Sequence, residues 1–127
     1  MPTRDFERIR KILLLVDGDS LEHFDSGWVW ARGSEFFVES DKYQIVLLSQ
    51  AEFLECTDIS MASVVPDRLR ITFAGHDYLD SIRDDGIWNK TKQAVAETGG
   101  SATLEIIKSL ATGFLKKKIE QHTGITF

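Results

Sequence analysis

The feature that constrains the fold most is a change of hydrophobic period within residues 68–92. Leu69, Ile71 and Phe73 alternate with polar side chains, and this two-residue period is typical of a half-buried β-strand. From Tyr78 onwards the apolar residues recur at steps of three and four, as they do on one face of an α-helix. The pattern therefore predicts a strand that runs directly into a helix.

The junction between the two periods carries signals of its own. Thr72 suits the N-cap of the helix, because its hydroxyl can accept a free backbone N–H of the first turn. Gly75 is a poor helix former, so we expect it there for close packing against a neighbouring backbone. We expect a break or bend at Gly86, followed by a helix over residues 87–98.

The N-terminal part of the chain predicts a helix and then a hairpin. Residues 4–16 place apolar side chains at helical spacing, and Gly18 then suits a left-handed cap. Residues 28–30 and 36–38 are rich in aromatic and β-branched side chains. They predict two short strands that pair with each other around a turn at residues 31–35.

A second helix is expected over residues 40–55. Asp41 and Gln44 have the spacing of a capping box, and Ser40 is the alternative cap. The exposed positions of this helix would be drawn from Lys42, Gln44, Ser49, Gln50, Glu52 and Glu55.

The remaining elements are a second hairpin and a C-terminal helix. Residues 56–73 predict two strands around a turn at Pro66-Asp67. The glycines in residues 98–101 predict a stop, after which Ser101 would cap a final helix over residues 102–121.

The central stretch also resembles a known family. The runs Ile71 to Asp85 and Ile87 to Lys90 are similar to the signature of DUF2513, a bacterial and phage family of unknown function. The N-terminal helix and the Gly99-Gly100-Ser101 segment with its lysine-rich helix resemble the two ends of that family. The resemblance implies a winged-helix-like fold, and it offers no activity that could be transferred to this chain.

We therefore expect an α+β fold with a winged-helix-like core and a C-terminal helical extension. The core would span residues 1–98, with the second hairpin as the wing and the helix over residues 40–55 as the counterpart of a recognition helix. Residues 99–127 would form an amphipathic helix that either packs on the core or forms a homodimer.

Composition limits the classes of function. The chain of 127 residues has a net charge of −5, which argues against avid nucleic-acid binding because such binding depends on Lys and Arg contacts to phosphate. Cys56 is the single cysteine, so neither an internal disulfide nor a cysteine-based metal site is expected. With no long apolar run, we expect a cytoplasmic protein that does not bind membranes.

Two candidate binding sets follow from residue type and position. Candidate nucleic-acid contacts are Lys42 and Gln44 on the second helix and Arg68 and Arg70 on the wing. These arginines are equally suited to pair with the acidic residues of 17–39. Candidate partner contacts are Trp28 and Trp30, since tryptophan is enriched at binding hot spots. Alternatively, these tryptophans cover the core.

Catalytic chemistry finds no support in the sequence. The histidines are scattered without the spacing of metal ligands, and Cys56 has no local base. We expect no enzyme activity, no metal and no cofactor. Structural roles are expected for the residues of the family signature: Thr72, Gly75, His76, Asp80, Arg83, Asp84, Trp88, Asn89 and Lys90.

Two hypotheses about function remain. The first is a small DNA-binding or transcription-associated protein of bacterial or prophage origin, which follows from the winged-helix analogy. The second is a protein–protein adaptor or inhibitor that keeps the scaffold without its DNA-binding face, which follows from the acidic charge and the two tryptophans.

Overall fold

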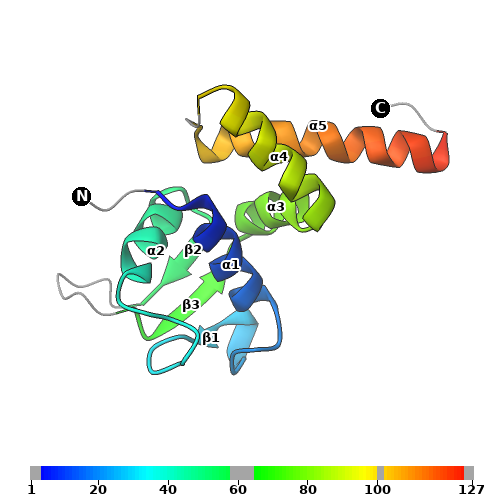
Figure 1. The fold of residues 1–127 in the computed structure, drawn as a ribbon. Coiled ribbons are helices and arrows are strands. Elements are labelled where there is room, and N and C mark those ends of the chain that lie inside the picture. The colour runs from blue at the N-terminus through cyan, green and yellow to red at the C-terminus, as the bar shows by residue number, and fades with distance from the viewer. Residues whose placement is uncertain (1–3, 58–64, 100–101, 125–127) are drawn as a thin grey trace. The chain divides into compact units, whose positions relative to one another are not determined.

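The structure is a computed structural model that describes residues 4–57, 65–99 and 102–124. The chain divides into two compact units, Met1–Leu79 and Asp80–Phe127. Within the described ranges the fold is α+β, with five α-helices and one three-stranded antiparallel sheet (Figure 1).

The first unit contains helices α1 (Phe6–Asp17) and α2 (Asp41–Gln50) and strands β1 (Val29–Trp30), β2 (Leu54–Cys56) and β3 (Arg68–Ile71). Helix α1 packs against α2 and β3, and α2 packs against β2 (Figure 1). The core between them is formed by buried aliphatic side chains: Ile9, Ile12, Leu13, Ile45, Leu48, Leu54 and Leu69. Burial of this apolar area is the main stabilising contribution to the unit.

The sheet has the strand order β1-β3-β2. A hairpin is present as β2 and β3, but β2 ends at Cys56, so the two paired strands are joined through residues 57–67 and not by the tight turn expected at Pro66-Asp67. Residues 58–64 lie outside the described ranges. The hairpin expected over residues 28–38 is wrong. Residues 36–38 form no strand, and β1 pairs instead with β3 through Val29–Leu69 and Trp30–Arg68.

The ends of α1 and α2 also differ from expectation. Gly18 has an extended backbone with φ of −86°, so it is not a left-handed cap. Helix α2 ends at Gln50 rather than 55, because Glu52 takes φ of +63° and turns the chain. The N–H of Glu52 then donates to the Ser49 carbonyl, and the N–H of Phe53 donates to the Leu48 carbonyl. This pair of bonds is a Schellman motif with a glutamate where glycine is usual.

Asp41 and Gln44 are buried and form no capping box. Asp41 instead accepts two 2.6 Å hydrogen bonds from the Arg8 guanidinium and a third bond from the N–H of Val38. Gln44 accepts the N–H of Asp5 at 2.9 Å. Ser40 occupies the N-cap position of α2 without a side-chain cap bond. These polar side chains therefore join α1 to α2.

The predicted junction from strand to helix is confirmed. Helix α3 (Phe73–Ile82) follows β3 directly, and Thr72 Oγ1 accepts the N–H of Gly75 at 3.0 Å. A Cβ on Gly75 would collide with the carbonyl oxygen of Phe53 and would lie 2.9 Å from Ile71 Cγ1. The glycine is thus required by a close approach of two backbones, as its position in the sequence predicts.

The second unit contains the end of α3 and two helices that pack together, α4 (Asp85–Glu97) and α5 (Leu104–Thr123). The break before α4 falls at Asp84, which caps the helix, and Gly86 lies inside the first turn. Thr103 caps α5, and the predicted cap Ser101 lies outside the described ranges. No helix of the described part could cross a membrane.

Candidate functional site

The sheet brings members of the two predicted binding sets, Trp30, Arg68 and Arg70, onto one face. Trp30 is directly opposite Arg68 in the ladder, and Glu55 is directly opposite Arg70. Because side chains alternate along a strand, Arg68 and Arg70 project to the same side, opposite to that of the buried Leu69. The tryptophans and arginines that were candidates for different functions are therefore neighbours.

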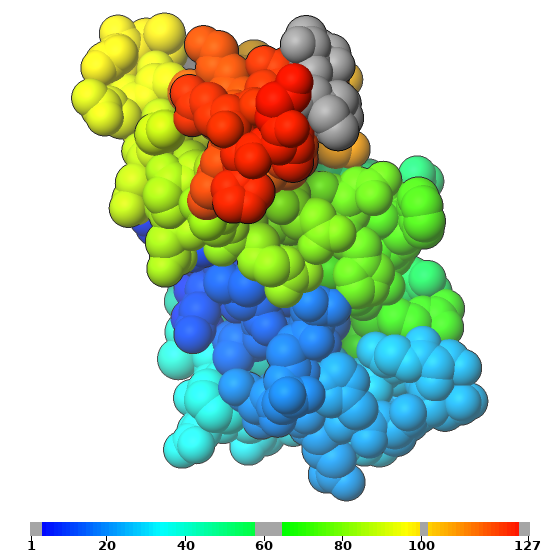
Figure 2. Space-filling model, turned by 90° about the vertical axis from the view of Figure 1, so that its right-hand side faces the viewer, coloured from blue at the N-terminus to red at the C-terminus, as the bar shows by residue number. Residues whose placement is uncertain are grey.

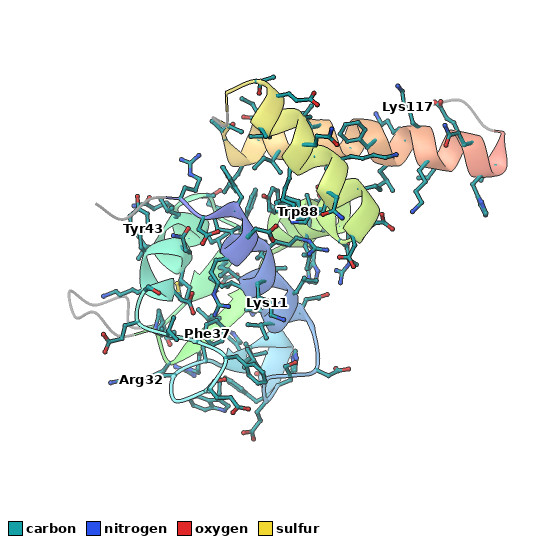
Figure 3. The ribbon with its side chains drawn as sticks, viewed as in Figure 1. Lys11, Arg32, Phe37, Tyr43, Trp88 and Lys117 are labelled. Carbon is teal, nitrogen blue, oxygen red and sulfur yellow. The ribbon has the colours of Figure 1, made fainter. Side chains whose placement is uncertain are left out.

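A tight turn before β1 adds two more aromatic rings to this face. Ser26 and Gly27 have φ of +55° and +84°, so the chain reverses between Phe24 and Trp28. The N–H of Phe24 donates to the Trp28 carbonyl at 3.0 Å, which closes the turn. The segment that leads into β1 lies at the molecular surface (light blue in Figure 2).

Aromatic rings and guanidinium groups alternate across this face. The rings of Phe24 and Trp30 stack with centroids 4.9 Å apart. The Arg68 guanidinium lies 5.8 Å from the Trp30 centroid and 6.0 Å from those of Phe24 and Trp28. The Arg70 guanidinium lies 4.8 Å from the Trp28 centroid. These distances are within the range of cation–π attraction.

Arg70 also makes polar contacts. Its guanidinium donates to Glu55 Oε2 at 2.7 Å and to the Ser26 carbonyl at 3.5 Å. The predicted pairing of the arginines with acidic residues of 17–39 is not the arrangement for Arg70, since its carboxylate partner comes from β2. We name the face formed by Phe24, Trp28, Trp30, Glu55, Arg68 and Arg70 the Trp–Arg surface.

The Trp–Arg surface is open to solvent. Trp30 is 44% exposed and Phe24 is 38% exposed, whereas Trp28 is half-buried. The alternative that both tryptophans cover the core therefore does not hold for Trp30. Sequence reasoning missed Phe24 and placed Glu55 on a helix. The run of aromatics at positions 24, 28 and 30 was the signal that could have found Phe24.

The other two predicted nucleic-acid contacts, Lys42 and Gln44, lie on α2 and not on the Trp–Arg surface. Gln44 is buried and bonded to the backbone of Asp5, so its amide cannot reach a base edge. Lys42 is half-buried on α2. Only the arginine half of that predicted set therefore lies on the Trp–Arg surface.

The histidine and cysteine provide no reactive arrangement in the described residues. His76 Nδ1 lies 3.5 Å from Asp17 Oδ1, and no group of three or more His, Cys, Asp or Glu there could hold a metal ion. Burial raises the pKa of the Cys56 thiol, which keeps it protonated near neutral pH. A protonated thiol is a poor nucleophile.

The acidic residues of the signature lie at helix ends in the second unit. Asp80 pairs with Arg83 at 2.9 Å. Asp84 accepts the N–H of Ile87 at 2.9 Å and the Lys118 ammonium at 2.9 Å. These two bonds hold the pKa of Asp84 below its ordinary value, and the bond from the N–H of Ile87 has the larger effect. Trp88 is buried, whereas Asn89 and Lys90 are exposed.

The model of a family described as "Hypothetical protein (DUF2513)" matches residues 3–101. A protein of Haemophilus influenzae described as "Uncharacterized protein" is 29% identical over 124 residues, which cover 91% of this chain and 98% of that relative. No solved structure matches.

Proposed function

Because the chain belongs to the DUF2513 family, whose description names no activity, we propose a function from the geometry alone. The protein is a non-catalytic binding module that docks a protein partner on its Trp–Arg surface. The observation that carries this proposal is the gathering of Phe24, Trp30 and Arg68 on a solvent-exposed face of the sheet. Aromatic residues and arginine are the types enriched at the centres of protein interfaces.

The side chains of the Trp–Arg surface are preorganised for binding. The Phe24–Trp30 stack and the cation–π contacts of Arg68 hold these side chains against each other, so little side-chain entropy remains to be lost. An ion pair with Glu55 likewise restricts the side chain of Arg70. Planar groups that are already ordered and half-exposed give a partner a large apolar contact area at low entropic cost.

Electrostatics favour a protein partner over duplex DNA. The first unit carries 14 acidic and eight basic side chains. Arg70 is paired with Glu55, and Arg68 lies among three rings, so neither presents an isolated charge to a phosphate. A duplex reader needs several Lys or Arg contacts to the DNA backbone. The β2–β3 hairpin supports a winged-helix-like scaffold in which the wing serves protein recognition.

Affinity capture with matched baits tests the proposal. Wild-type protein, Trp30→Ala and Phe73→Ala would be immobilised and exposed to lysate of the source organism. Phe73 is the control because it is 84% exposed and lies outside the Trp–Arg surface. We expect a partner retained by wild type and by Phe73→Ala to bind Trp30→Ala about 30-fold more weakly, as for a hot-spot residue. Equal retention by all three baits would overturn the proposal.

A second measurement separates the two hypotheses about function. Fluorescence anisotropy with mixed duplex DNA across a salt series should give no binding near physiological salt. Tight binding whose logarithm falls linearly with log salt, and which Arg68→Ala with Arg70→Ala abolishes, would replace the protein-binding proposal with a DNA-binding function. Circular dichroism of each variant would confirm that the domain remains folded.

A further inference from the structure

The C-terminal half of α5 has apolar residues that α4 does not cover. Helix α5 has 20 residues and α4 has 13, and only Ile107 and Ala111 of α5 are buried. Figure 1 shows the C-terminal half of α5 continuing beyond α4. In that half Leu115 and Ile119 are half-exposed and lie four residues apart, so they share one face.

These two residues line a groove with the start of α4. Ile87, Leu115 and Ile119 provide its apolar lining, and its volume is about 510 Å³. The ion pair between Asp84 and Lys118, 2.9 Å long, fixes one wall. Figure 2 shows the end of α5 at the surface, in orange and red.

The charges beside this apolar pair are self-complementary. Lys116 and Glu120 follow Leu115 and Ile119 by one position each, so they lie together on one flank of the apolar face. The midpoint between Leu115 and Ile119 lies within one residue of the midpoint between Lys116 and Glu120. A single two-fold axis near that point would place Leu115 of each copy opposite Ile119 of the other and each Lys116 opposite Glu120 of the partner subunit.

We propose that two copies of this chain associate through antiparallel packing of the C-terminal halves of α5. Leu115 and Ile119 of one copy enter the groove of the other, and two symmetric Lys116–Glu120 pairs set the direction and register. The arrangement is isologous, as a two-fold dimer requires. Charged residues beside an apolar seam set orientation and partner choice in helix pairs generally. The inference is independent of the proposed function of the Trp–Arg surface.

Sedimentation velocity over a concentration series is the first test. We expect wild type to shift from monomer to dimer with rising concentration. Leu115→Glu should weaken association at least about tenfold, because it buries a charge in the seam. Ile106→Glu is the matched control, since Ile106 is 49% exposed on the same helix and lies in its first half. A wild type that stays monomeric, or a dimer that Leu115→Glu leaves unchanged, would overturn the proposal.

Charge reversal tests the antiparallel register directly. Lys116→Glu alone and Glu120→Lys alone each place like charges opposite one another in the dimer, so each variant should be mainly monomeric. An equimolar mixture should form a heterodimer, because every facing pair is then opposite in sign. A loss of helix stability within one chain would not be rescued by mixing. Failure of the mixture to associate, when wild type does, would exclude this register and the proposal with it.

Discussion

Gly75 lies where α3 begins beside the carbonyl of Phe53, with no room for a side chain. We predict that Gly75→Ala lowers the free energy of unfolding by about 2–3 kcal/mol, because the backbones must separate. Gly113→Ala is the control, since Gly113 is helical with nothing within 4 Å of an added Cβ. It should raise stability by about 0.5–1 kcal/mol. Urea unfolding measures both, and equal effects would contradict the close approach.

Glu52 is the second residue at which the backbone conformation matters, because its positive φ ends helix α2. Its left-handed φ of +63° costs about 1–2 kcal/mol for a residue with a side chain. Glu52→Gly removes that strain while the two Schellman bonds at the end of α2 remain. We predict a gain of about 1 kcal/mol in the free energy of unfolding, measured by urea titration. A loss of stability would show that the Glu52 side chain has a contact that outweighs the strain.

Residue-level predictions from the sequence succeeded where the physical cause is local. Thr72 caps α3 by accepting the N–H of Gly75, three residues further on, and its neighbours in the chain already indicate the turn. Gln44 was assigned to the surface and is buried. Its partner, the N–H of Asp5, is 39 residues away, and no local pattern indicates such a contact.

At the scale of elements, a partly buried ion pair between Arg8 and Asp41 joins α1 to α2. Asp41 is 2% exposed and Arg8 is 29% exposed, and their two-point contact raises the pKa of Arg8. We predict that Asp41→Ala lowers the free energy of unfolding by about 2 kcal/mol, because it leaves the half-buried Arg8 guanidinium without its carboxylate and the N–H of Val38 without its acceptor. Arg32→Ala breaks the exposed Arg32–Asp67 pair and should cost less than about 1 kcal/mol. Thermal unfolding of both variants tests this ranking.

The start of α4 should depend on pH through Asp84. Its pKa is lowered in the folded protein, so its stabilising contribution is present above its ordinary value of 3.8 and is lost as pH falls through the folded value. Asp84→Ala should lower the midpoint of thermal unfolding at pH 7. The midpoint of this variant should also decrease less than that of wild type as the pH is lowered into the acid range. Lys118→Ala should have the same sign and a smaller effect, because the Ile87 bond to Asp84 remains. Identical acid profiles for wild type and Asp84→Ala would refute this role.

Strand existence was easier to predict than strand pairing. Residues 29–30 of the expected strand over 28–30 do form β1, but its partner is β3, 40 residues further along the chain, and not the nearby residues 36–38. Local pattern identifies a strand, whereas pairing depends on which faces are buried in the whole unit. The same limit applied to the candidate site. Trp30 and Arg68 were both identified, but only the register makes them neighbours on the Trp–Arg surface.

At the scale of the molecule, the two units differ in how they bury apolar area. Ile9, Leu13 and Leu69 of the first unit are fully buried between helices and sheet. In the second unit α4 covers α5 along only part of its length. The apolar pattern of α5 in the sequence was compatible both with packing on the core and with a dimer. The half-exposed Leu115 and Ile119 are the observation from which we propose a dimer.

Native-state hydrogen exchange at a concentration well below that of association tests this difference. The amides around Ile9 and Leu13 in α1 should be at least about 100-fold more protected than those of the last turn of α5, because opening the core exposes buried area and fraying a helix end does not. Raising the concentration should slow exchange near Leu115 and Ile119 and leave α1 unchanged. If the last turn of α5 were as protected as α1 even at high dilution, this chain itself would cover the helix, and the dimer would lose its physical basis.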